Sequence, residues 1–196
     1  MNAFPAYFPL TGRKVVIVGT NDHAEGKAKL FVGSPAELTR IGADGPEAFD
    51  PATYAGAALA FISTSSEADD IRAAQAARAA HVPVNVVDRP ALCDFFTPAL
   101  VDRGEVVVAI GTGGNAPLLS AVLRKDIEAV VPQGAGRLAA LLGGLRGEIR
   151  EAFPEFEARR VFLLAVLDGP AAKAALDGDL DRAETLLRAA IAEKRA

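Results

Sequence analysis

The chain has 196 residues, of which 51% are hydrophobic, and a formal net charge of −4 with an isoelectric point near 5.3. This length suffices to bury a core, and no apolar run is long enough for a membrane span, so we expect a soluble cytoplasmic protein that does not bind membranes. The acidic balance argues against nucleic acid as a partner, and the single cysteine, Cys93, excludes an internal disulfide and a cysteine-rich metal site.

The first half of the chain alternates between strand-like and helix-like stretches. Residues 13–18 ("RKVVIV") predict a strand that ends at Gly19, and "AEGKAKLF" after it predicts a helix. A weaker strand is expected at 36–41 ("AELTRI"), then a loop rich in Gly, Pro and Asp, then a buried strand at 56–64 ("GAALAFIST"). The serine and the acidic residues that open "SEADDIRAAQAARAAH" favour a helix start.

Two further strands are predicted at "VPVNVVD", which ends at Asp88, and at "GEVVVAIGT", which leads into a glycine-rich turn. Strands that alternate with helices are typical of an α/β fold with a parallel sheet, in which ligands bind at the carboxyl ends of the strands. We therefore predict a Rossmann-like, NAD-binding type of domain over residues 1–112.

From Gly114 onward the pattern is helical, and no comparable strand is expected. We predict a helical dimerisation region over residues 113–150 and a C-terminal helical region over 151–196. These helices are rich in Ala and Leu, and their apolar faces are broader than a small helical portion can bury. A homodimer, held mainly by the helices of 114–150, is the predicted way to cover them.

Several motifs together resemble the siroheme synthase N-terminal family. "FPL" and "VVIVG" near the start combine with "VNVVDRPALCDFFTPALVDRGEVVVAIGTGGNAPLLSAVLRKDIE", and the resemblance covers most of residues 4–150. Members of this family are precorrin-2 dehydrogenases, and some also act as sirohydrochlorin ferrochelatases. The resemblance implies NAD as cofactor, the tetrapyrroles precorrin-2 and sirohydrochlorin as substrates, and Fe²⁺ as a substrate of the second activity. We expect the methyltransferase domain that is fused to some members to be absent.

Asp88 matches the catalytic aspartate of that family. It directly follows an apolar strand, which places its carboxylate at the edge of the sheet where sites form. A base there could take the proton released in the oxidation, or deprotonate pyrrole N–H groups before metal insertion. The alternative is that Asp88 only caps the turn before Pro90.

The turn after the first strand is the predicted cofactor-binding segment, formed by Gly19, Thr20, Asn21, Asp22, His23 and Ala24. Family members usually have three consecutive glycines here; this chain keeps Gly19 and has Thr20 and Asn21 in place of the others, while Ala24 and Lys27 match. Because those side chains occupy space that a pyrophosphate needs, we expect weak NAD binding. Asp44 could hold a ribose, whereas Arg40 would favour a 2′-phosphate. The segment 42–56 is shorter than in the family, and the role of His23 stays open.

Substrate binding is predicted at the second glycine-rich turn and at nearby cations. A close backbone approach and a helix N-terminus capped by Asn115 would suit an anionic tetrapyrrole, although a tight turn without a ligand is the alternative. Arginines could bind its carboxylates, or lie on the surface. The predicted residues are Thr112, Gly113, Gly114, Asn115, Arg89, Arg103 and Arg124.

We predict no resident metal, because His23 and His81 lie far apart in the chain without a carboxylate spacing pattern. The leading hypothesis is NAD-dependent oxidation of precorrin-2 to sirohydrochlorin, with ferrous iron insertion as a further activity. Two alternatives stay open. One is a chelatase that has lost NAD binding, and the other is a non-catalytic tetrapyrrole-binding protein.

Overall fold

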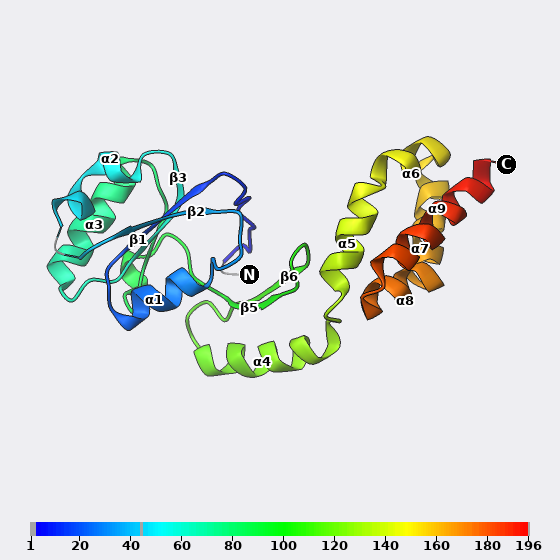
Figure 1. Ribbon diagram of the computed structural model, residues 1–196. Helices are drawn as coiled ribbons and strands as arrows, with labels where there is room; N and C mark the ends of the chain where they lie inside the picture. Colours follow the sequence, from blue (N-terminus) through cyan, green and yellow to red (C-terminus); the bar gives the residue numbers. More distant parts are fainter. Residues whose placement is uncertain (1–2, 44, 196) are drawn as a thin grey trace. The chain divides into compact units, whose positions relative to one another are not determined.

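The computed structural model describes residues 3–43 and 45–195. The chain forms two compact units: the first contains the residues up to Thr97 together with Gly111–Ala116, and the second contains Pro98–Ile110 and the residues from Pro117 onward (Figure 1). Within the described ranges, no helix is both long enough and apolar enough to cross a bilayer. The cytoplasmic location stays a prediction.

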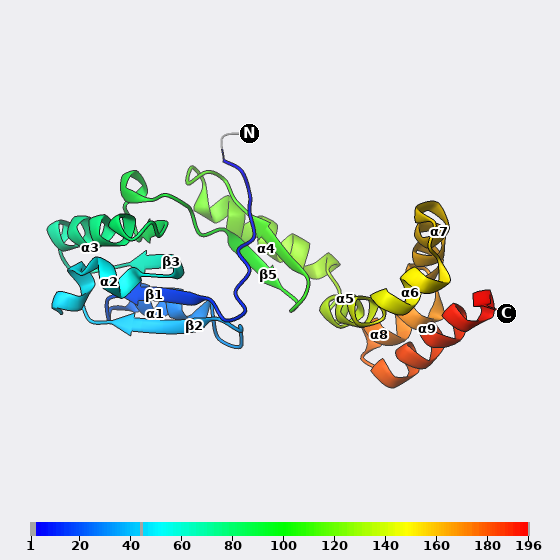
Figure 2. The same cartoon turned by 90° about the horizontal axis from the view of Figure 1, so that it is seen from above.

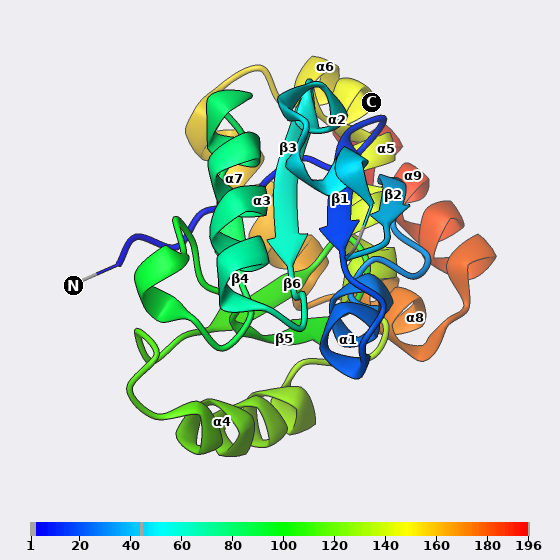
Figure 3. The same ribbon diagram turned by 90° about the vertical axis from the view of Figure 1, so that its left-hand side faces the viewer.

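The first unit is built on a four-stranded parallel sheet with the strand order β2-β1-β3-β4. Its strands are β1 (Lys14–Val18), β2 (Glu37–Ile41), β3 (Ala57–Ile62) and β4 (Val84–Val86). Figure 3 shows β1 and β3 side by side and pointing the same way. The predicted Rossmann-like parallel sheet is confirmed for these strands.

Helices cover both faces of this sheet because its central strands, β1 and β3, are apolar on both sides. Val16 and Val18 pack with the alanines of α3 (Glu67–Ala79), whereas Val15 and Ile17 pack on the opposite face with α1 (Asp22–Lys29). Alternate residues of a strand point to opposite faces, which explains this division. In Figure 2, α3 runs alongside β3.

Short helices occupy the segment that was predicted to be a loop between the second and third strands. The 3₁₀ helix η1 (Pro46–Phe49) leads into α2 (Pro51–Tyr54), and a second 3₁₀ helix, η2 (Pro90–Leu92), follows β4. The loop prediction for this segment was therefore wrong in part. Its proline residues take the first turn of each short helix, where the missing N–H costs nothing.

A β-hairpin corrects the predicted place of "GEVVVAIGT". This stretch contains β6 (Val107–Ile110), which pairs antiparallel with β5 (Ala99–Asp102) in a separate two-stranded sheet. Only residues 103–106 connect the two strands, whereas a parallel connection needs about a dozen residues or more. The tight turn is possible because Gly104 adopts a φ of 76° and its N–H donates to the Asp102 carboxylate. The sequence reasoning did not recognise β5, and so it assigned β6 to the parallel sheet.

The second unit contains this hairpin and, up to residue 195, the helices α4 (Pro117–Val130), α5 (Ala135–Gly144), α6 (Arg146–Ala152), α7 (Phe156–Leu167), α8 (Pro170–Asp177) and α9 (Leu180–Arg195). Its core gathers Leu145, Ile149, Phe153 and Leu187. At Gly136 an added Cβ would lie 1.5 Å from the Arg103 carbonyl, so only glycine lets α5 approach the hairpin turn. The predicted helical character of the chain beyond Gly114 is confirmed.

Candidate functional site

The turn between β1 and α1 depends on Gly19. This residue has a φ of 118°, and a Cβ added to it would lie 2.0 Å from the Ser63 carbonyl oxygen. Its N–H donates to the carbonyl of Ile41 at the end of β2. Glycine is therefore required here both for backbone conformation and for the close approach of β3.

Asn21 completes this turn in place of a second glycine. Its side-chain Oδ1 accepts from the Ala24 N–H at 2.9 Å, which makes Asn21 the N-cap of α1. The same oxygen accepts from the Ser63 hydroxyl at 3.1 Å, and Nδ2 donates to the Ser63 carbonyl at 3.1 Å. The amide of Asn21 is thus bound to α1 and to the end of β3, whereas Thr20 is exposed.

Arg40, one of the two predicted partners of a cofactor ribose, lies in β2. Arg40 forms an ion pair with Glu25 of α1, so its guanidinium already has an acidic neighbour. Hydrogen bonding to Arg40 holds the pKa of Glu25 below its usual value. Asp44 lies outside the residues that the structure describes.

The sequence predicts a strand that ends at Asp88, whereas β4 ends at Val86 and Asp88 lies in the turn that follows. Asp88 has a φ of 58°, a left-handed conformation that is uncommon for a residue with a side chain. The neighbouring backbone is fixed by hydrogen bonds from the Val87 N–H to Ile62 and from the Arg89 N–H to Val86. The Asp88 side chain is 79% exposed, and its Oδ2 lies 3.9 Å from Nε2 of His23 on α1. Two segments that are distant in the sequence therefore meet at this carboxylate.

Arg89, a predicted substrate-binding cation, is bound to the acidic residues of α3. Its Nε donates to the Asp70 carboxylate at 2.8 Å, and its Nη1 lies 3.0 Å from the Glu67 carboxylate. Asp70 is 3% exposed and also accepts from the backbone and the hydroxyl of Thr64. The hydrogen bond to Asp70, together with Glu67, raises the pKa of Arg89. The structure thus shows Arg89 as a clamp between the Asp88 loop and α3, and its binding of substrate stays a prediction.

Lys27 is a cation that the sequence reasoning did not include among the site residues. It lies one helical turn after His23 on α1, and its Nζ donates to the Thr97 hydroxyl at 2.9 Å and lies 5.8 Å from the Phe61 ring. Burial lowers the pKa of Lys27, while the charges of Cys93 and Asp88 raise it. The available signals were the match of Lys27 to the family motif and its four-residue spacing from His23 on a predicted helix.

The turn at residues 111–116 is held by Thr112. The Asn115 N–H and its side-chain amide both donate to the Thr112 carbonyl, and the Ala116 N–H donates to the Thr112 hydroxyl at 3.2 Å. Gly113 and Gly114 both have positive φ, as a tight turn requires. α4 begins at Pro117, two residues after Asn115, and the expected cap of this helix by Asn115 stays a prediction.

Arg103 and Arg124 belong to the second unit, where both hold Glu128 of α4. The Arg103 side chain is 7% exposed, lies 3.5 Å from the Glu128 carboxylate and donates to the Glu128 carbonyl. Nη1 of Arg124 lies 2.5 Å from the same carboxylate. These contacts join the hairpin turn to α4, and binding of substrate by either arginine stays a prediction.

Potential metal ligands are sparse in the described part of the chain, where no group of three or more His, Cys, Asp or Glu residues could hold a metal ion. His81 is exposed, with a φ of 59° after α3. Cys93 is partly buried, its thiol bonds to the backbone of Val86, and burial raises the thiol pKa. These contacts agree with a packing role for Cys93.

Two family models match the chain. Residues 6–99 match the model described as "Putative NAD(P)-binding", and residues 134–191 match the "Sirohaem synthase dimerisation region". The siroheme synthase of Methylococcus capsulatus is 38% identical over the whole of this chain, and that of Azotobacter vinelandii is 35% identical over 98% of it. The chain belongs to the siroheme synthase N-terminal family. It spans 45% of the length of each of these two relatives.

The fold of this family member is also that of a solved protein. The structure of SirC, a precorrin-2 dehydrogenase, matches 96% of this chain and 98% of its own with a TM-score of 0.76 and 17% identity. At this identity the likeness concerns the fold. It extends over both units, including the hairpin and helices that follow the parallel sheet.

The first turn of this family member fits a dinucleotide. β1, the positive φ of Gly19 and the start of α1 reproduce the strand, turn and helix on which a pyrophosphate binds. The polar atoms of the Asn21 side chain are bound to Ala24 and Ser63. Of the two residues that stand in place of glycines in this turn, Thr20 is therefore the one with an exposed side chain.

Proposed function

We propose that this chain is an NAD-dependent precorrin-2 dehydrogenase that forms sirohydrochlorin. The main support for the proposal is that Asp88, at the carboxyl end of β4, lies close to the first turn of α1. This helix begins at the dinucleotide-type turn. Membership of the siroheme synthase family supports the substrate class. A base beside a cofactor turn is what the removal of a hydride and a proton requires.

The cofactor would be held by Gly19 and the start of α1, and when bound its nicotinamide supplies the hydride acceptor. Asp88 takes the proton that leaves the tetrapyrrole in the same oxidation. The left-handed backbone of Asp88 and the clamp of Arg89 on Asp70 keep this carboxylate at the edge of the sheet. Lys27, one helical turn after His23 on α1, adds a positive charge that interacts with Asp88. A positive charge there favours a substrate with carboxylate groups.

The test is a dehydrogenase assay with precorrin-2 and NAD⁺, in which the reduced cofactor and sirohydrochlorin are followed together. The wild-type chain should form both in equal amounts. Asp88→Asn should retain the fold and lose activity, whereas Asp69→Asn, which alters a partly exposed carboxylate paired with Arg72, should retain both. Absence of turnover by the wild-type protein with NAD⁺ and with NADP⁺ would refute the proposal.

Ferrous iron insertion into sirohydrochlorin is a second candidate activity, with Fe²⁺ as a substrate. The exposed carboxylate of Asp88 supports it, because the same base could deprotonate pyrrole N–H groups. A chelatase that has lost NAD binding would insert iron without binding NAD⁺. A tetrapyrrole-binding protein without catalysis would bind sirohydrochlorin and perform neither reaction. Separate titrations with NAD⁺ and sirohydrochlorin, followed by both assays, distinguish these alternatives.

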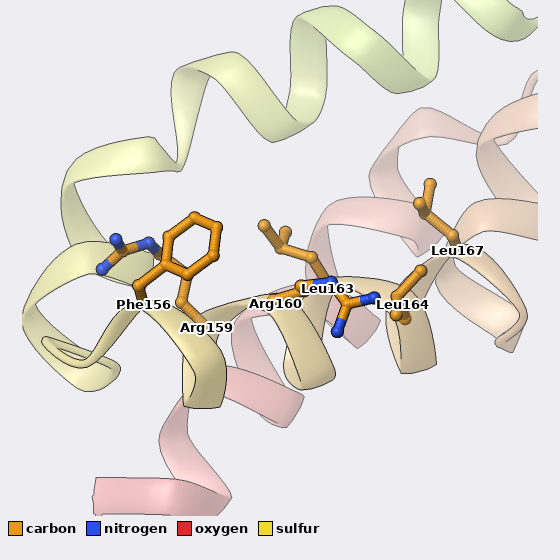
Figure 4. A pocket seen from close by; sticks show the side chains of 6 residues that line it. All are labelled: Phe156, Arg159, Arg160, Leu163, Leu164 and Leu167. Carbon is orange, nitrogen blue, oxygen red and sulfur yellow. The ribbon is translucent and has the colours of Figure 1, made fainter.

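We also propose that the chain acts as a homodimer. Residues 134–191 match the dimerisation region, and α7 within it carries an exposed apolar row that includes Phe156, Leu164 and Leu167. Figure 4 shows these side chains along a shallow groove that Arg159, Arg160 and Leu163 also line. A second copy would cover this surface. The contribution of residues 114–150 stays a prediction, which the exposed Leu119 and Leu123 of α4 support.

A further inference from the structure

The side chain of His23, which faces Asp88, has no chemical role in the function described so far. Nε2 of His23 lies 3.9 Å from Oδ2 of Asp88, and the two side chains are 63% and 79% exposed. Both can therefore meet a ligand and solvent. A hydrogen bond requires only a slightly shorter approach, and such bonds are often long before the substrate binds.

Both partners are held in place by their own elements. His23 lies in the first turn of α1, which the Asn21 cap and the Gly19 turn fix to the end of β3. Asp88 is fixed by its left-handed backbone and by Arg89, which α3 binds through Asp70. A non-glycine residue with positive φ costs free energy and persists where its surroundings determine it, which is common at functional sites.

We propose that His23 is a proton-relay residue that accepts from Asp88 the proton released by the oxidised tetrapyrrole. The inference rests on the proposed dehydrogenase function and deepens it. Two electrons leave the substrate with the hydride and reduce the nicotinamide, while the proton breaks from the substrate onto Oδ2 of Asp88. It then moves to Nε2 of His23 and from there to solvent, which restores the carboxylate for the next turnover.

An imidazole suits the second position because, near neutral pH, imidazoles accept protons more readily than carboxylates do. The transfer therefore draws the proton away from the tetrapyrrole while the product is still bound. Of the other charges at this site, Lys27 on α1 is bound to Thr97, and Arg89 is bound to Asp70 and Glu67. Among the described contacts, neither cation forms an ion pair with Asp88.

The test combines kinetics with a direct measure of the contact. His23→Ala should lower kcat by about 10- to 100-fold without raising KM, and added imidazole should restore part of the rate. In an Asp88→Asn background, His23→Ala should cause no further loss, because His23 acts through Asp88. His81→Asn, at an exposed histidine in a turn with positive φ, is the matched control and should leave kcat unchanged.

The contact itself can be observed without turnover. The ring resonances of His23 in the NMR spectrum of the free protein should shift when Asp88 is replaced by Asn, and those of His81 should not. Wild-type kcat in His23→Ala, or a loss of equal factor in both backgrounds, would overturn the relay while leaving the dehydrogenase proposal intact. A wild-type protein that does not oxidise precorrin-2 would instead overturn the proposed function.

Discussion

Thr20→Gly should tighten NAD⁺ binding more than Asn21→Gly does. Thr20 is exposed, whereas the Asn21 amide is bound to Ala24 and Ser63. Removal of the Thr20 side chain therefore frees space at the start of α1 without removing a described contact of Asn21. We expect a gain of about tenfold in affinity, equivalent to about 1.4 kcal/mol.

Asn21→Gly should lower the free energy of unfolding more than Thr20→Gly does. Asn21→Gly loses side-chain hydrogen bonds to Ala24 N–H, the Ser63 carbonyl and the Ser63 hydroxyl. A net contribution of about 0.5–1.5 kcal/mol for each, reduced because glycine is tolerated at an N-cap, gives a loss of about 2 kcal/mol. Thr20→Gly should lose about 0.5–1 kcal/mol, mainly through the greater freedom of the unfolded chain.

Isothermal titration calorimetry with NAD⁺ and thermal melts of the two single variants and the double variant measure both effects. The control is Gly26→Ala, at an exposed position on α1 with open space for a methyl group. Gly12→Ala is unsuitable as a control because Gly12 has a φ of 63°. If Asn21→Gly tightens binding as much as Thr20→Gly, or if neither variant changes the affinity, the steric reasoning is wrong.

Three further predictions concern the site, the dimer and the core. Asp88→Asn should slow precorrin-2 oxidation by about 10²–10⁴-fold in single-turnover assays while sirohydrochlorin binding stays nearly unchanged; wild-type rates would remove Asp88 from the mechanism. Leu164→Glu should give monomers in light scattering, as should charges at Leu119 and Leu123, and a wild-type monomer at micromolar concentration would contradict the dimer. Burial raises the pKa of Tyr54, so the stability that its neutral hydroxyl contributes is present below the unfolded pKa of about 10 and falls as the pH rises above it. Denaturant unfolding of Tyr54→Phe should show less loss over that alkaline range, at the cost of about 1 kcal/mol at neutral pH for the hydrogen bond to Ala48.

The sequence by itself determined the local elements of the first unit and the place of the Asp88 carboxylate after a strand. A run of β-branched residues predicts β1, an apolar run predicts β3, and the serine before α3 is the N-cap that accepts from Asp69 N–H. Asp88 could be placed at the end of β4 because a strand end is marked by where apolar residues stop. These features depend on residues close together in the chain, so periodicity and capping rules suffice to find them.

Only the tertiary structure decided which strands pair and which charges meet. The pairing of β6 with β5 was missed because β5 has four residues and a short strand carries little periodicity. The contact of His23 with Asp88 and the clamp of Arg89 on Asp70 join separate elements, so no local pattern of residues predicts them. Such partners are determined by how helices pack on a sheet, and that packing brings together side chains that are distant along the chain.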